Sequence, residues 1–131
     1  MNDAKSKVSV VIPAMGFAHS VGVLLDALVN QEHLPDEVII VDSSSDNSVL
    51  DIADNFREKL KINFVKVDQA FPGEARNIGV KNATNELLAF LDSKTIPSST
   101  WLKKGIEELT VNSYDVVFGS TLYIAKANKQ R

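Results

Sequence analysis

Three short apolar runs in this sequence end in aspartate, at Asp42, Asp68 and Asp92. Aspartate is common in turns and at helix N-caps, where its carboxylate accepts backbone N–H groups, so each of them alone has a structural explanation. Carboxylates that gather at one place repel one another. A metal ion, a cationic ligand, the hydroxyls of a ribose or the N–H of a base would relieve that repulsion. The three aspartates therefore predict a polar binding site if the fold brings them to one edge.

The segment FPGEARNIGVKNA, residues 71–83, carries the second chemical signal. Its arginine, Arg76, comes at the start of a predicted helix, from where a guanidinium can reach a phosphate or a carbonyl oxygen. An ion pair with Glu74 or with one of the strand-end aspartates is the structural alternative. The serine-rich segment SSSDNS, residues 43–48, leads into another predicted helix, and we expect Ser45 or Asp46 to cap it.

Several common site types are excluded by their motifs. The sequence contains neither GxxxxGK[ST] nor GxGxxG nor GxSxG, so a P-loop, a dinucleotide fingerprint and a serine-hydrolase elbow are absent. His19 and His33 lack the spacing of metal ligands, and Trp101 lies in an apolar helical stripe that favours the core.

The elements that must position these residues alternate along the chain. Nearly continuous apolar runs predict strands that are covered on both faces, as in parallel sheets, and stripes of helical period lie between them. The strands are expected at residues 8–12, 37–42, 62–68, 86–92 and 115–119, and the helices at 21–29, 49–60, 74–83 and from about 97 to 109, the last with Ser98 as its N-cap. This order predicts an α/β fold, an open three-layer sandwich around a mostly parallel sheet. Ligands bind such sheets beyond the carboxyl ends of the strands.

Composition describes an ordinary globular domain of 131 residues, with 14 Lys plus Arg, 17 Asp plus Glu and no cysteine. A disulfide scaffold and a thiolate metal site are thus excluded, and the slight acidity argues against a nucleic-acid-coating protein. No apolar run approaches the length of a membrane helix, and the first residues lack a signal-peptide pattern. We expect one cytoplasmic domain over residues 1–131, with an ordered core at about 7–123 and a frayed tail at 124–131.

Four stretches together resemble family-2 glycosyltransferases of the GT-A fold, a Rossmann-like architecture. They are VSVVIPAMG, QEHLPDEVIIVDSSSDNS, GEARNIGVKNATNELLAFLDSK and TWLKKGIEEL, and the resemblance covers residues 8–119. It implies a domain that binds a nucleotide-diphosphate sugar, a UDP-sugar first of all, and passes the sugar to an acceptor (a glycan, a lipid-linked sugar or a protein).

The resemblance also assigns roles to residues of the strand ends. It places Pro13, Ala14 and Met15 beside the base and ribose, and makes Asp42 the acceptor of the base imide N–H. Arg76 is expected to contact the base or the diphosphate, and Asp92 matches the first aspartate of the family's D-x-D motif, near the ribose and the metal. The expected nucleotide-sugar-binding residues are Pro13, Ala14, Met15, Asp42, Ser44, Arg76, Asp92 and Lys94.

The chain departs from the family at two points. Lys94 stands where the second aspartate of D-x-D would bind Mn²⁺ or Mg²⁺, so Asp92 is the remaining metal ligand. An ammonium cannot ligate a cation; either Lys94 itself faces the diphosphate or the metal-dependent chemistry has been lost. The resemblance also implies that the general base lies in an acceptor half beyond the matched residues, so we name no catalytic residue.

Three functions stay open on the sequence. The first is a glycosyltransferase, or the donor half of one. The second is a nucleotide-sugar-binding module without turnover, completed by another chain or forming a homodimer. The third, a signalling receiver domain, would need an acidic pair after the first strand and a lysine after the fifth, where this chain has Pro13-Ala14 and Gly119-Ser120.

Overall fold

Strands and helices alternate strictly along residues 7–111, the part of the chain that the computed structural model describes. The elements are β1 (Val8–Ala14), α1 (Ala18–Val29), β2 (Glu37–Asp42), α2 (Ser48–Asp54), β3 (Ile62–Lys66), α3 (Pro72–Asn82), β4 (Leu87–Phe90) and α4 (Trp101–Thr110). This order confirms the predicted strand–helix alternation through its first four repeats. The expected fifth strand at 115–119 and the tail at 124–131 lie outside the described residues.

The four strands form one parallel sheet in the order β3-β2-β1-β4. From β1 the chain moves outward to β2 and β3, and then returns to place β4 on the other side of β1. The strand order therefore reverses between β1 and β4, which is the place where open α/β sheets bind ligands.

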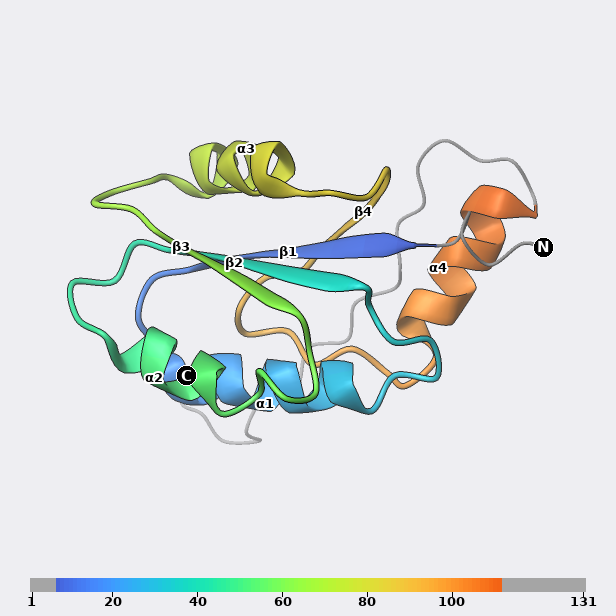
Figure 1. Cartoon of the computed structure of the whole chain (residues 1–131), viewed down its shortest axis with the longest axis horizontal. Coiled ribbons are helices and arrows are strands. Elements are labelled where there is room, and N and C mark those ends of the chain that lie inside the picture. Colours follow the sequence, from blue (N-terminus) through green and yellow to red (C-terminus); the bar gives the residue numbers. More distant parts are fainter. Residues whose placement is uncertain (1–6, 112–131) are drawn as a thin grey trace, which may run out of the picture.

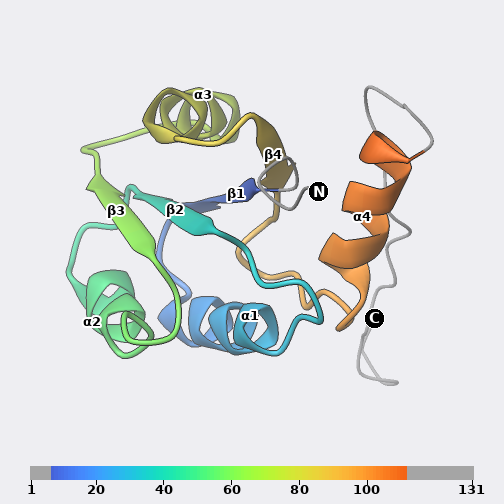
Figure 2. The same ribbon diagram turned by 45° about the vertical axis from the view of Figure 1, so that its right-hand side comes forward.

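Helices cover both faces of the sheet, so the predicted three-layer architecture is confirmed (Figure 1). Helices α1 and α2 lie on one face and α3 lies on the other, while α4 stands beyond the β4 side of the sheet (Figure 2). No helix in the described residues is both long enough and apolar enough to span a membrane.

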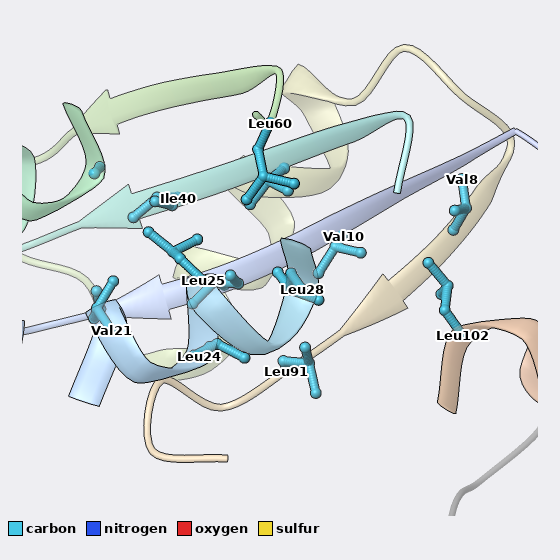
Figure 3. Close-up of a cluster of buried hydrophobic side chains, with 14 of the residues drawn as sticks. Val8, Val10, Val21, Leu24, Leu25, Leu28, Ile40, Leu60, Leu91 and Leu102 are labelled. Atoms are coloured by element: carbon cyan, nitrogen blue, oxygen red, sulfur yellow. The ribbon is translucent and has the colours of Figure 1, made fainter. Parts of the chain in front are cut away.

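Two apolar clusters join the layers. The larger one fills the space between the sheet and helices α1, α2 and α4, and it includes the alternate residues Val8, Val10 and Ile12 of β1. Figure 3 shows Val8 and Val10 in this cluster. The smaller one joins the other face of β1 and β2 to α3, through Val11, Ile39, Val41 and Ala75. Because β1 and β2 are buried on both faces, they read as continuous apolar runs in the sequence.

A buried polar network fixes the chain just before β4. Ser9 donates its hydroxyl to Glu37 Oε1 at 2.8 Å, and Thr84 donates to the same oxygen from its backbone N–H and its hydroxyl. Burial raises the pKa of Glu37, but these donors and the charge of Lys61 outweigh it and bring the pKa below its usual value of 4.5. The ionised carboxylate therefore ties β1, β2 and the α3–β4 connection together at the amino ends of the strands.

Helix α2 is shorter than predicted. The apolar stripe indicates a helix to Leu60, but α2 ends at Asp54. From Asn55 the backbone N–H groups bind the carbonyls three residues back, at Ile52 and Ala53, which tightens the chain into turns. Leu60 nevertheless reaches the core at 4% exposure, so the stripe predicted burial correctly and the helix end wrongly.

The N-cap of α2 also differs from the prediction of Ser45 or Asp46. Asn47 is the N-cap of α2 and makes no side-chain cap bond, whereas Asp46 accepts the N–H and the hydroxyl of Ser48. The bond from the Ser48 hydroxyl lowers the pKa of Asp46 most, and the bond from the Ser48 N–H lowers it further.

The first N–H groups of α4 are also satisfied differently from the prediction. The N-cap is Thr100, and Ser98 contributes its carbonyl rather than its hydroxyl. The Oε1 of buried Gln31 accepts the N–H of Leu102 at 3.1 Å, while its Nε2 donates to Ser98 O at 2.6 Å. The side chain of Gln31, which is distant in sequence, thus accepts a helix N-terminal N–H that Ser98 was expected to satisfy.

Candidate functional site

A pocket of about 280 Å³ opens at the carboxyl ends of β1 and β4, where the strand order reverses. The end of β1, the first residue after β2, the start of α3 and the turn after β4 form its walls. The lining residues are Pro13, Ala14, Met15, Phe17, Ser43, Ala70, Ala75, Arg76, Asp92, Ser93 and Lys94. Six of the eight predicted site residues are in this set, so the fold does bring most of them together.

The β1–α1 turn forms one wall of the pocket and has an unusual backbone. Gly16 and Phe17 both adopt positive φ, at 73° and 56°, a conformation that glycine accepts freely and a bulky residue adopts rarely. The Gly16 N–H donates to Ser44 Oγ at 2.6 Å, which ties the turn to the segment after β2. As a result the Phe17 ring is held largely exposed, at 59%, beside the pocket.

The turn after β4 forms the facing wall. Asp92 Oδ1 accepts the backbone N–H of Lys94 at 3.2 Å, and Asp92 O accepts the N–H of Thr95 at 3.0 Å. This tight turn directs Lys94 back toward β1, so that its Nζ lies 3.8 Å from the centroid of the Phe17 ring. The contact is a cation–π interaction between the two walls.

Helix α3 brings the second cation. Its residue Ala75 is buried against the sheet at 4% exposure, whereas the next residue, Arg76, is exposed and lines the pocket. The ion pairs in the described residues are Arg57–Asp54, Lys66–Asp42 and Lys103–Glu32. Neither Arg76 nor Lys94 takes part in one, so two cationic groups face one carboxylate, Asp92, in the pocket.

Asp42 and Ser44 do not line the pocket. The Asp42 carboxylate is wholly buried, its Oδ1 accepts the hydroxyl and N–H of Ser44 at 2.5 and 3.0 Å, and its Oδ2 accepts Lys66 Nζ at 2.9 Å. In this arrangement the carboxylate is bonded to neighbouring residues through both oxygens, and it fixes Ser44 and through it the Gly16 turn. The residue that reaches the pocket from this strand end is the next one, Ser43.

The third strand-end aspartate lies elsewhere. Asp68 follows β3, the edge strand farthest from β4, and it is exposed and absent from the pocket lining. The expected convergence of three carboxylates therefore does not occur: Lys66 neutralises Asp42, Asp68 lies at the edge, and only Asp92 faces the pocket.

The residues of the pocket do not make a site for the divalent metal that the family resemblance implies. Mg²⁺ is commonly held by one or two carboxylates together with substrate phosphates. Here Asp92 is the one carboxylate in the pocket lining, and the ammonium of Lys94, at the second expected position, would repel the ion. Throughout the described part of the chain, no group of three or more His, Cys, Asp or Glu residues could hold a metal ion.

Sequence reasoning missed several lining residues. Ser43 and Ser93 directly follow predicted strands and lie in the strand-end segments where a ligand is expected, but they are not among the expected binding residues. Phe17 is less evident from the sequence, where it is an aromatic residue that directly follows Gly16 in the turn after the first strand. Ala70 and Ala75 show no chemical signal, because their contribution is a small side chain that leaves room.

Comparison with known proteins identifies the family. The family model described as Glycosyl transferase family 2 matches residues 9–131. A glycosyltransferase of Haloferax volcanii, AglE, is 30% identical over 118 residues, which are 86% of this chain and 38% of that protein. The poly(ribitol-phosphate) β-N-acetylglucosaminyltransferase TarS of Staphylococcus aureus is 29% identical over 115 residues, 85% of this chain and 20% of TarS.

Solved structures of TarS have the same fold. The crystal structure of its residues 1–349 in complex with UDP matches 82% of this chain and 33% of that one, with a TM-score of 0.74 and 28% identity. The complex of the same fragment with UDP-GlcNAc gives a TM-score of 0.74 and covers 82% of this chain and 32% of the other. This chain thus spans well under half the length of these relatives.

Proposed function

The chain belongs to glycosyl transferase family 2, and we propose that its pocket between β1 and β4 binds the nucleotide diphosphate of a sugar donor, UDP-linked in the first instance. The observation that carries the proposal is the charge of the pocket: Arg76 and Lys94, which form no ion pair with any residue that the structure describes, face it together with a single carboxylate. Two cations beside a strand-order reversal suit a diphosphate. The TarS structures that match this fold contain UDP and UDP-GlcNAc, which supports the choice of ligand.

In the proposed arrangement the walls of the pocket take different parts of the donor. Pro13, Ala14, Met15 and Ser43 provide a mostly apolar surface with one hydroxyl, which suits a base and its ribose. Asp92 accepts from ribose or sugar hydroxyls, since a carboxylate is an acceptor. Asp42 and Ser44 support this surface from behind, through the bond from the Gly16 N–H to Ser44 Oγ.

The reaction proposed for the family member is glycosyl transfer. The acceptor hydroxyl oxygen bonds to the anomeric carbon, the bond from that carbon to the diphosphate oxygen breaks, and the nucleoside diphosphate leaves with the electron pair. The acceptor proton passes to a base, a role for which we nominate no described residue. The part played by this pocket is to stabilise the negative charge that grows on the leaving diphosphate.

Calorimetric titration of the chain with UDP, uridine and UDP-GlcNAc tests the proposal. We expect saturable binding of both diphosphates and weaker binding of uridine. Arg76→Gln should weaken UDP binding by about tenfold, the effect of losing one charge-assisted contact. The matched control is Arg57→Gln, because Arg57 is paired with Asp54 near the amino end of β3, away from the pocket.

The outcomes separate the candidate functions. Failure of UDP and UDP-GlcNAc to bind would refute the proposal. Release of UDP from UDP-GlcNAc, with transfer of the sugar, would show an active transferase. Tight binding with no release would favour the second candidate, a donor-binding module, for which the single carboxylate of the pocket is the supporting observation.

A further inference from the structure

We infer that the ammonium of Lys94, and not a divalent cation, neutralises the diphosphate in this pocket, an inference that rests on the proposed function. It concerns how the donor is held, because a nucleoside diphosphate carries charge that an open pocket must balance. The family resemblance assigns that task to a metal bound between two aspartates. In this chain the residues that line the pocket favour a side chain in that role.

The residues that line the pocket offer few ligands to a divalent cation. A divalent cation in this pocket would have one carboxylate, Asp92, and its Oδ1 already accepts the Lys94 N–H at 3.2 Å. The turn that this bond stabilises also fixes Lys94 two residues away, so that an ammonium would repel a metal ion from the one carboxylate available. The same charge attracts a phosphate.

The ammonium of Lys94 contacts the opposite wall of the pocket. Lys94 Nζ lies over the Phe17 ring at 3.8 Å from the centroid, so the turn after β4 contacts the β1–α1 turn through two residues that both line the pocket. A ring face attracts the cation without neutralising it, unlike a carboxylate. The contact with Phe17 therefore leaves the charge of Lys94 available to a ligand of the pocket that both residues line.

A comparison within the chain supports this reading. The other lysine at the carboxyl edge of the sheet, Lys66, donates to Asp42 at 2.9 Å and to the Asp46 carbonyl at 2.6 Å, so its charge is already used. Lys94 takes part in none of the ion pairs of residues 7–111. Of these two lysines, only Lys94 combines a place in the pocket lining with an unneutralised charge.

The test measures UDP binding by calorimetry in EDTA and in Mn²⁺, for the wild-type chain and three variants. Lys94→Met removes the ammonium and keeps the length of the side chain, and Lys94→Arg keeps the charge. Lys104→Met is the matched control, because Lys104 is exposed on α4 and does not line the pocket. Thermal unfolding by circular dichroism checks that each variant is folded.

We expect wild-type affinity for UDP to be the same in EDTA and in Mn²⁺. Lys94→Met should lower it in EDTA by about tenfold or more, as expected for a lost contact to a charged group. Lys94→Arg and Lys104→Met should retain it, and Lys94→Met should leave uridine binding unchanged, since uridine has no phosphate.

Two results would overturn the inference while leaving the proposed function intact. One is wild-type UDP binding that appears only with Mn²⁺. The other is Lys94→Met binding UDP in EDTA as tightly as the wild-type chain does. Absence of wild-type UDP binding under both conditions would instead refute the proposed function itself.

Discussion

Replacing Gly79 by alanine should destabilise the fold through one contact between α3 and the sheet. A Cβ built on Gly79 would overlap the Val11 side chain, meeting its Cγ1, Cβ and Cγ2. Val11 is wholly buried in β1 and paired with Ile39 of β2 and Phe90 of β4, so the strand cannot retreat. Helix α3 must therefore move instead. Because α3 carries the lining residues Ala75 and Arg76, its movement also changes the pocket.

The expected magnitude comes from two opposing effects. Alanine in place of glycine inside a helix stabilises by about 0.5–1 kcal/mol, and overpacking a core contact destabilises by about 1–3 kcal/mol. Gly105→Ala on α4 is the matched control, because a Cβ there has nothing within 4 Å. The unfolding free energies of the two variants should thus differ by about 1–3 kcal/mol, with Gly79→Ala the less stable.

Urea unfolding followed by the fluorescence of the single tryptophan, Trp101, measures both values. Val11→Ala combined with Gly79→Ala removes the overlapping methyl groups, and the double variant should be more stable than the sum of the two single changes by about 0.5–3 kcal/mol. If Gly79→Ala stabilises the chain as much as Gly105→Ala does, the reasoning about the α3–β1 contact is wrong.

Three further predictions concern the supports of the site. Folding lowers the pKa of Glu37, so the ionised carboxylate stabilises the fold fully above its unfolded pKa near 4.5. This stabilisation is lost as the pH falls through the folded pKa. Thermal melts of Glu37→Gln should therefore depend less on pH in that acidic range than wild-type melts. Lys66→Met leaves the buried Asp42 carboxylate without its cation, and urea unfolding should show a loss of about 1–3 kcal/mol, less than for a wholly buried pair because Lys66 is 41% exposed. Gly16→Ala should lower stability by about 1 kcal/mol in the same assay, since φ at this residue is 73°, and it should weaken UDP binding because the turn lines the pocket.

The fold could be predicted because its signals are local. The runs at β1 and β2 are apolar on both faces, and the stripes of α1 and α2 have helical period, so element order and the parallel sheet followed directly. The ends of α2 and α4 could not be read in this way. The N–H of Leu102 at the start of α4 is satisfied by Gln31, 71 residues earlier in the chain, and no local pattern contains that contact.

The different fates of Asp42 and Asp92 show where the site prediction depended on three-dimensional register. Asp42 ends the buried strand β2, Asp92 lies two residues beyond the partly buried strand β4, and both carry a charge that must be balanced. In the sheet, Asp42 is the register partner of Lys66 on β3, so a cross-strand ion pair balances its charge within the fold. Asp92 lies beyond β4, whose pairing with β1 ends at Phe90, and no cation in the described residues pairs with it. Register with a neighbouring strand, which no local pattern contains, therefore separates the paired carboxylate Asp42 from Asp92, which lines the pocket beside Lys94.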